Sequence, residues 1–376
     1  MSSALLPDLA KLPILQDLEA LLISGIPLLD ARAPVEFAEG AFPTAHNLPL
    51  LNDAERAAIG TRYKQAGQEA AIELGLQQIS GTIKTERVNA WQSFFEQHPN
   101  AALYCFRGGL RSKITQQWLY QQTGHLYPRV EGGYKALRRF VLEQLELMPT
   151  WLSPLVLSGR TGSGKTRLLA ELPAVIDLEA LANHRGSAFG HQVTPQPSLA
   201  SFENALLTHL LQQRARGFHT LIFEDESRTI GSIHLPETLF HLLREAPLII
   251  LQTPDNERIA ISFQAYVVDM LQAFIQHYQD QIQGLAAFEH YVWQSVGKIA
   301  KRLGGVRYAK VVELIKTAFA EQQEHGNLEK HRAWVAFLLL EYYDPMYDYQ
   351  LAKKQQRVLF QGSAAQIKQF LQQLLA

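Results

Sequence analysis

A glycine-rich run near the middle of the chain constrains the fold more than any other feature of the sequence. Residues 159–166 read Gly-Arg-Thr-Gly-Ser-Gly-Lys-Thr and match the pattern G-x-x-x-x-G-K-[ST] at every fixed position. The apolar run 155–157 precedes the loop, and residues 167–171 after it are typical of a helix. This strand–loop–helix context is the one the pattern requires, so we expect a phosphate-binding loop in an α/β domain.

The expected ligand of this loop is a di- or triphosphate. Backbone N–H groups and the Lys165 ammonium would cradle phosphate oxygens, and the Thr166 hydroxyl is a candidate ligand of Mg²⁺. Asp225 follows the apolar run 221–223 and is a candidate acid near that metal. A solvated strand end explains the three acids 224–226 equally well. The predicted phosphate-binding residues are Gly159, Arg160, Thr161, Gly162, Ser163, Gly164, Lys165 and Thr166.

The one cysteine of the chain stands in a second loop with recognisable chemistry. Cys105 follows the apolar run 101–104, and a helix is predicted over 113–122. Two glycines let the backbone curl around a small anion, and two arginines and a helix N-terminus favour negative charge. These features stabilise a thiolate, the reactive form of cysteine, and favour a nucleophile over a buried structural thiol. The candidate catalytic residues are Cys105, Arg107 and Arg111, and the candidate substrate contacts in the loop are Gly108 and Gly109.

Length and composition indicate several ordinary domains. The 376 residues exceed what one hydrophobic core usually supports, and the net charge of −1 gives no overall attraction to nucleic acid. Strands alternate with helices over 1–145 and again over 150–256, whereas 257–376 reads as mostly helical. Residues 177–178 are among the predicted strands. The expected fold class is therefore α/β, with two α/β domains and a helical C-terminal region.

The sequence gives no sign of a targeting or membrane segment. The N-terminus lacks a basic stretch followed by an apolar core. The longest apolar runs, such as 248–251 and 334–340, are far shorter than the roughly 20 residues of a membrane span. A single cysteine excludes an internal disulfide framework. We expect a cytoplasmic protein, a monomer, with no membrane contact.

Runs on both sides of the cysteine resemble the signatures of rhodanese domains. The first comprises Leu29-Asp30-Ala31-Arg32 with residues 36–37, Gly40 and 45–49, and the closing run is 130–134. In the common rhodanese loop an arginine follows the cysteine by five residues, whereas Arg111 follows Cys105 by six. This longer loop resembles that of the rhodanese-related dual-specificity phosphatases. Asp30 and Arg32 become candidate substrate contacts by this resemblance.

A rhodanese-like domain joined to a phosphate-binding loop resembles the family of tRNA 2-selenouridine synthases. The resemblance extends over essentially the whole chain and includes residues 183–190, 224–228 and 342–348. It implies a transferase that exchanges sulfur for selenium at C2 of the wobble uridine in tRNA carrying 2-thiouridine. It also implies two steps: alkylation of the sulfur by geranyl diphosphate, then displacement of the S-geranyl group by selenium from selenophosphate.

The resemblance also assigns expected roles. Selenium either passes through a Cys105 perselenide or goes directly from selenophosphate to the base. The expected partners are tRNA and a selenophosphate supplier, and no tightly bound cofactor is expected beyond Mg²⁺. His184 and Arg185 are candidate substrate contacts. Candidate contacts to tRNA are the aromatic run 342–349, the basic stretch Lys298, Lys301, Arg302, Arg307 and Lys310, and the group Lys353, Lys354 and Arg357.

Three other functions fit parts of the sequence. A P-loop kinase or ATPase would use the cysteine domain only as a sensor and would not need Cys105 for turnover. A rhodanese-type sulfurtransferase or a phosphatase would not need Lys165. A tRNA-binding recruiter of a selenium-delivery partner would form no product. Only the synthase requires both side chains for a single product.

Overall fold

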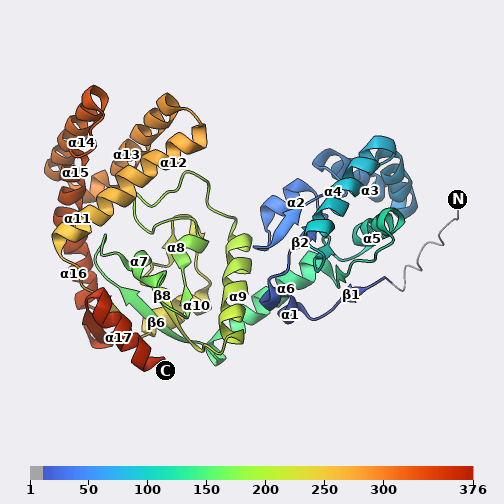
Figure 1. Ribbon diagram of the computed structural model, residues 1–376, viewed down its shortest axis with the longest axis horizontal. Helices are drawn as coiled ribbons and strands as arrows, with labels where there is room; N and C mark the ends of the chain where they lie inside the picture. Colours follow the sequence, from blue (N-terminus) through green and yellow to red (C-terminus); the bar gives the residue numbers. More distant parts are fainter. Residues whose placement is uncertain (1–11, 376) are drawn as a thin grey trace. The chain divides into compact units, whose positions relative to one another are not determined.

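The computed structural model describes residues 12–375, which form two compact units (Figure 1). Unit 1 comprises the described residues up to Leu147 together with Ser198–Arg216, and unit 2 comprises the rest. The predicted α/β class is confirmed, because each unit is built on a parallel five-stranded sheet. Apart from Ser198–Arg216, the predicted regions 150–256 and 257–376 lie in one unit, and β12 near the end of the chain adds a strand to the phosphate-loop sheet.

The sheet of unit 1 has the strand order β1-β5-β4-β2-β3, with every pair parallel. All residues of β2 and β4 are buried, as expected for a parallel sheet covered on both faces. The strands are β1 (Ile14–Leu15), β2 (Leu28–Asp30), β3 (Ala45–Asn47), β4 (Ala102–Tyr104) and β5 (Arg129–Val130).

The helices of unit 1 begin and end where the sequence supplies caps. Asn52 and Glu55 form a capping box at the start of α3, and Gly124 in the left-handed conformation ends α5. The helices are α1 (Leu18–Ser24), α2 (Pro34–Glu39), α3 (Asp53–Gln78), α4 (Gly81–Gln97), α5 (Leu110–Thr123), α6 (Gly133–Leu147) and α9 (Leu199–Ala215). Helix α9 joins this unit through its contacts with α1 and α6, which the sequence order did not indicate.

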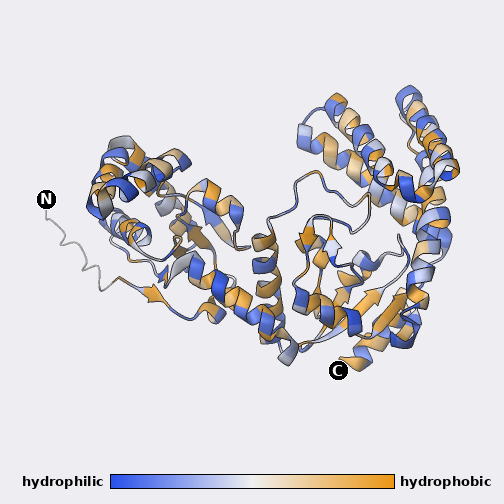
Figure 2. Cartoon of the chain, turned by 180° about the vertical axis from the view of Figure 1, so that it is seen from behind, coloured by the Kyte–Doolittle hydropathy of each residue, from blue (hydrophilic) through white to orange (hydrophobic). Residues whose placement is uncertain are grey.

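The sheet of unit 2 has the order β12-β11-β6-β8-β7, again with every pair parallel. Its strands are largely apolar (Figure 2). They pack against Leu168 and Leu169 in the helix that follows the phosphate loop. The strands are β6 (Ser153–Ser158), β7 (Val175–Ile176), β8 (Thr220–Glu224), β11 (Leu248–Leu251) and β12 (Val358–Gly362); β9 (Thr229–Ile230) and β10 (Ile233–His234) form a separate hairpin.

Two details of unit 2 differ from the sequence expectation. The predicted strand at residues 177–178 is wrong: the strand is β7, and Asp177 instead caps α8 by accepting a hydrogen bond from the N–H of Ala180 at 2.7 Å. An aspartate side chain that can bond the backbone two or three residues onward favours a helix start over a strand. Strand β12 was not predicted, because the surrounding sequence is helical.

The remaining helices of unit 2 enclose a core rich in aromatic side chains, including Phe189, Phe288 and Trp334. They are α7 (Lys165–Leu169), α8 (Leu178–Leu181), α10 (Glu237–Glu245), α11 (Asp255–Phe263), α12 (Asp269–Tyr278), α13 (Gln281–Leu303), α14 (Gly305–His325), α15 (His331–Leu338), α16 (Asp344–Ala352) and α17 (Ala364–Leu374). Short 3₁₀ turns at Met148–Thr150 and Gln355–Arg357 precede β6 and β12, and π-helical turns at Gln264–Val268 and Leu339–Tyr343 interrupt the helical region.

One helical stretch of the described residues, Asp255–Tyr278, is long and apolar enough to cross a membrane by length and composition. A helix in a domain core passes the same test, so the finding is weak. Here Phe263, Val267 and Met270 pack into the helical core of unit 2. Arg258 in the same stretch forms a buried ion pair with Asp344 and a second ion pair with the exposed Asp255.

Candidate active site

The predicted cysteine loop lies at the C-terminal end of β4 and the N-terminus of α5. Cys105 is buried and unpaired, and it lines a cavity of about 840 Å³ in unit 1. The backbone N–H groups of residues 107–109 donate no hydrogen bond to any residue of the described chain. Backbone donors free at a helix N-terminus attract an anion, so the geometry agrees with the chemistry expected of this loop.

The closing run, residues 130–134, is in close contact with the cysteine loop. Gly108 (φ 61°) and Gly133 (φ 58°) adopt backbone conformations that side chains rarely allow. A Cβ atom at Gly133 would lie 2.2 Å from the carbonyl oxygen of Cys105 and 2.4 Å from the nitrogen of Gly108. The closing run therefore packs against the backbone of the cysteine loop. A larger residue at either glycine would displace the cysteine loop.

The two predicted arginines of the loop have different surroundings. Arg107 is exposed and lines the cavity beside Cys105. Arg111 donates hydrogen bonds to both carboxylate oxygens of Glu36, at 2.6 and 3.0 Å. Burial opposes the charge of Arg111, but the bonds to Glu36 and the charge of Cys105 raise its pKa. Arg111 thus supplies fixed positive charge near the thiol, while Arg107 is free to meet a ligand.

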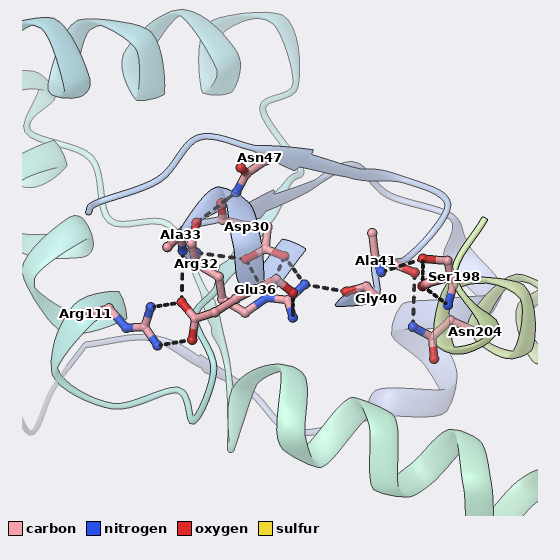
Figure 3. A network of polar contacts seen from close by, with 11 residues as sticks. Asp30, Arg32, Ala33, Glu36, Gly40, Ala41, Asn47, Arg111, Ser198 and Asn204 are labelled. Atoms are coloured by element: carbon pink, nitrogen blue, oxygen red, sulfur yellow. Dashed lines mark hydrogen bonds and ion pairs between the residues drawn. The ribbon is translucent and has the colours of Figure 1, made fainter. Parts of the chain in front are cut away.

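Asp30 and Arg32, predicted as substrate contacts, are 0% and 1% exposed. Figure 3 shows them in a polar network beneath the loop. Arg32 donates to Asp30 at 2.7 Å and to the carbonyl oxygen of Gly40 at 2.6 Å, and its guanidinium lies 3.8 Å from the ring centre of Tyr134. Both side chains are enclosed by protein groups, and neither lines the cavity at Cys105.

Arg129 is a neighbour of the cysteine loop that the sequence did not single out. Its Nε donates to the carbonyl oxygen of Gly108 at 3.2 Å, and its Nη1 is buried without a hydrogen-bond partner. Burial lowers the pKa of Arg129, and the negative charge of Cys105 and Glu131 opposes that effect. Arg129 immediately precedes the closing run 130–134, and nothing in its local pattern indicates contact with the loop.

The phosphate loop of unit 2 connects β6 to α7, as predicted. It lines a second cavity of about 570 Å³, which we call the phosphate cavity. Lys165 donates to the carbonyl oxygen of Gly159 at 2.9 Å, and Thr166 is exposed at the cavity. Gly162 and Gly164 have φ values of 78° and 87°, which only glycine adopts readily.

The outer side of the phosphate loop is held by a buried ion-pair cluster. Arg258, 1% exposed, donates to the carbonyl oxygen of Thr161 at 3.0 Å and to Asp344 at 2.9 Å. Arg160 pairs with Asp348 at 2.7 Å and does not line the phosphate cavity. The loop conformation therefore depends on residues from the C-terminal helices. Of the eight predicted phosphate-binding residues, Arg160 pairs with Asp348 and does not face the phosphate cavity.

The polar residues predicted around this loop separate into those that reach the cavity and those that do not. Asp225 and Arg185 line it, whereas His184 is buried and accepts a hydrogen bond from the N–H of Gly186. Asp225 accepts hydrogen bonds from Ser158 at 2.6 Å and from Lys354 at 2.7 Å. Lys354 thus forms an ion pair with Asp225, and it lines the phosphate cavity as well.

The other predicted tRNA contacts are spread over unit 2. Tyr342 and Tyr343 are buried in the core, and Tyr349 is 65% exposed. Arg357 donates to the carbonyl oxygens of Leu243 and Ala246. Lys298 pairs with His191, and Lys353 lies over the ring of Tyr349. In the basic stretch Lys310 pairs with Glu313 at 3.2 Å. Three exposed residues remain available for a phosphate backbone, and the second of them also lines the phosphate cavity: Lys301, Arg302 and Arg307.

A cluster of three glutamates lies beside Lys165, and sequence analysis did not select any of the three. Burial, with the charge of Glu226, raises the pKa of Glu179 to about 8. Burial and the charge of Glu179 raise the pKa of Glu224 to about 8, and burial raises that of Glu226 to about 7. In the sequence, Glu226 is only one of three consecutive acidic residues. Burial raises its pKa, and burial cannot be read from the sequence.

These carboxyl groups predict a pH dependence of stability in unit 2. The folded-state pKa values lie above the ordinary 4.5, so between about pH 4.5 and 8 the folded state holds more protons than the unfolded state. The free energy of unfolding must then fall as pH rises through this window. Each extra proton changes the unfolding equilibrium up to about tenfold per pH unit.

Replacement Glu179→Gln should make this fall shallower, because glutamine does not ionise. The measurement is hydrogen exchange of β8 amides from pH 5 to 8, corrected for intrinsic exchange rates. Glu245→Gln, on an 82% exposed side chain, is the matched control. Parallel pH profiles for wild type and Glu179→Gln would contradict the prediction.

Among residues 12–375, no group of three or more His, Cys, Asp or Glu side chains is arranged to hold a metal ion. The Thr166 hydroxyl nevertheless fits a magnesium ion whose other ligands are phosphate oxygens and water, as in other phosphate loops. A metal at Thr166 would therefore depend on a bound di- or triphosphate.

The fold and the two loops define a class of protein: a P-loop α/β protein that carries, in a second unit, a rhodanese-like cysteine loop. Comparison with known proteins gives the family. The model of the tRNA 2-selenouridine synthase AAA domain matches residues 152–376. The chain belongs to the tRNA 2-selenouridine synthase family.

Relatives named tRNA 2-selenouridine synthase match along nearly their whole length. The protein of Sulfurovum sp. (strain NBC37-1) is 47% identical, with 96% of this chain and 99% of the relative covered. The protein of Marinobacter nauticus is 49% identical, with 94% and 96% covered. A solved structure, the N-terminal domain of a putative ATP/GTP binding protein from Clostridium difficile 630, matches 34% of this chain and 98% of its own with 29% identity and a TM-score of 0.30, which is too low to bear on the fold.

Proposed function

We propose that this protein is a transferase that replaces sulfur by selenium at C2 of the wobble uridine in tRNA carrying 2-thiouridine. One observation carries the proposal. A chain that matches proteins named tRNA 2-selenouridine synthase over 94–96% of its length contains two chemically different sites, one in each unit. Exchange of an atom through an activated intermediate needs two kinds of chemistry, and each loop suits one of them.

The first step is alkylation of the sulfur at the phosphate cavity. The 2-thiouridine sulfur attacks C1 of geranyl diphosphate, the C1–O bond breaks, diphosphate leaves with the electron pair, and the N3 proton of the base is lost to water. Lys165 and the loop N–H groups meet the charge that develops on the diphosphate. Thr166 would hold a Mg²⁺ ion together with the diphosphate oxygens, and that ion would supply further positive charge.

The second step is displacement of the alkylated sulfur at the cysteine loop. The Cys105 thiolate attacks phosphorus in selenophosphate, the P–Se bond breaks, and selenide leaves with the electron pair. Selenide attacks C2 of the base, the C2–S bond breaks, and geranyl thiolate leaves and takes up a proton. Water then releases phosphate from Cys105. The exposed Arg107 and the free loop N–H groups are placed to bind the phosphoryl oxygens.

This sequence of steps needs no oxidant, because selenium stays at the selenide level throughout. A perselenide on Cys105 formed from selenophosphate would require removal of two electrons. The spacing from Cys105 to Arg111 supports attack on phosphorus, since it resembles that of the rhodanese-related phosphatases. Hydrolysis of the phosphocysteine completes the cycle.

The test is nucleoside mass spectrometry on 2-thiouridine-containing tRNA incubated with the purified protein. With geranyl diphosphate alone we expect S-geranyl-2-thiouridine, and with selenophosphate added we expect 2-selenouridine. Folded protein that returns 2-thiouridine unchanged under both conditions would overturn the proposal. Selenouridine formed without any geranyl diphosphate would overturn the first step.

A further inference from the structure

The cavity at Cys105 is larger than the cysteine chemistry requires. Its volume of about 840 Å³ lies in the upper part of the range for small-molecule sites. A selenophosphate ion at the loop would occupy only a small corner of this space. Most of the remaining wall is apolar and is contributed by Leu50, Leu51, Ile59, Ile72, Leu76 and Ile114.

Helix α3 forms much of this wall and is packed unlike a core helix. Of its 26 residues only Ala71 is buried. The helix is interrupted at Gly67, whose φ of 81° is not helical, and its two halves both face the cavity through Ile59, Tyr63 and Leu76. Tyr63 is 57% exposed and Leu76 51%. Large apolar side chains exposed around a concave site mark a surface that a ligand covers.

Charge is distributed unevenly around the cavity. Four cationic side chains line it, against the single carboxylate of Glu36, which already pairs with Arg111 and Arg56. Cys105 and Arg107 mark the reactive end. A ligand that fits must combine a polar group at the cysteine with an extended apolar part along α3. Beside its aliphatic side chains the wall carries the rings of Tyr63, Phe106 and Trp118, so it can hold a flexible hydrocarbon chain together with the base to which that chain is attached.

We propose that this cavity binds the hydrocarbon chain of the S-alkylated nucleoside, with the C2–S bond held at the Cys105 loop. The inference rests on the proposed function and adds where the intermediate is recognised: the second site selects alkylated tRNA by its chain. The chain leaves as part of the thiol, and burial of its apolar surface holds the intermediate until C2–S cleavage.

The first test measures selenation of tRNA carrying S-methyl-, S-dimethylallyl- or S-geranyl-2-thiouridine by the full-length protein. Each buried methylene should contribute about fourfold in kcat/KM. We therefore expect the S-geranyl substrate to exceed the S-methyl substrate by about 100-fold or more, mainly through KM. Equal values for the three substrates would overturn the inference while leaving the proposed function intact.

Two variants alter the wall without touching the loop. Leu76→Glu places a charge among the apolar groups, and Ala57→Trp, at an exposed position lining the cavity, fills part of it. Both should lower kcat/KM for the S-geranyl substrate about tenfold or more and change that for S-methyl by less than about threefold. Leu142→Glu is the matched control, because Leu142 is 46% exposed on α6 and lies outside the cavity wall. Loss equal to that of the control would contradict the proposal.

A binding measurement separates this inference from failure of the proposed reaction. Cys105 is the only cysteine in the chain, so iodoacetamide labelling reports on this site alone. S-geranyl-2-thiouridine nucleoside should slow the labelling, S-methyl-2-thiouridine should not, and Leu76→Glu should remove the protection. Equal protection by both nucleosides would point to recognition of the base and would overturn the inference. Absence of selenated product together with chain-dependent protection would instead count against the proposed reaction only.

Discussion

Replacement Cys105→Ala is expected to abolish formation of 2-selenouridine and to leave S-geranyl-2-thiouridine accumulating in the tRNA. The thiol is the nucleophile proposed to release selenide, and loss of a catalytic nucleophile typically lowers the rate by about 10³-fold or more. Alanine suits the fold, because Cys105 is 3% exposed within an apolar cluster of unit 1. The measurement is nucleoside mass spectrometry over time with both co-substrates present.

The geranylated intermediate serves as the internal control for Cys105→Ala. Its formation at the wild-type rate shows that the phosphate loop and tRNA binding are intact. Arg107→Ala should lower selenation in the same direction but less, because the loop N–H groups remain to bind phosphoryl oxygens. Undiminished 2-selenouridine from Cys105→Ala would mean that selenophosphate reacts with the base directly, and the role of the thiol would be wrong.

Those parts of the fold that follow from local pattern could be predicted from the sequence. Both reactive loops lie between a buried apolar strand and a helix. The cysteine loop has one glycine at positive φ, Gly108, and the phosphate loop has two, Gly162 and Gly164. Such features are encoded within about ten consecutive residues. Local pattern therefore located Cys105 and Lys165 at the ends of β4 and β6 without reference to distant parts of the chain.

What depends on contacts distant in sequence could not be predicted. Strand β12 pairs with β11, which lies more than a hundred residues earlier, and its own alternation is short and surrounded by helical sequence. Asp30 and Arg32 look like exposed polar residues in the sequence, but their partners, Gly40 and Tyr134, enclose them. Burial also makes Glu179 distinctive, and burial is a property of the packed unit.

Replacement Lys165→Ala is expected to block the first step, so that neither S-geranyl-2-thiouridine nor 2-selenouridine forms from 2-thiouridine tRNA. Lys165 lies at the start of α7 and contacts the loop carbonyl of Gly159, where its ammonium can move onto a bound diphosphate. Removal of one preorganised charge-stabilising group typically costs about 10²–10³-fold in rate. Arg244→Ala, on a 66% exposed side chain of α10 outside the phosphate cavity, is the matched control and should leave geranylation within about twofold of wild type.

Supplying tRNA that already carries S-geranyl-2-thiouridine should restore selenation by Lys165→Ala to nearly the wild-type rate, because the proposed second step uses the Cys105 loop, which lies in the other unit. The same tRNA should not rescue Cys105→Ala. Rescue of Lys165→Ala without rescue of Cys105→Ala by the same tRNA would show that the two sites act in different steps. A P-loop ATPase with a sensor domain would not show this pattern, nor would a sulfurtransferase with a regulatory P-loop, since each requires only one of the two side chains. Failure of the pre-alkylated tRNA to rescue Lys165→Ala, in a protein as stable as the Arg244→Ala control, would show that the phosphate loop also acts in the second step.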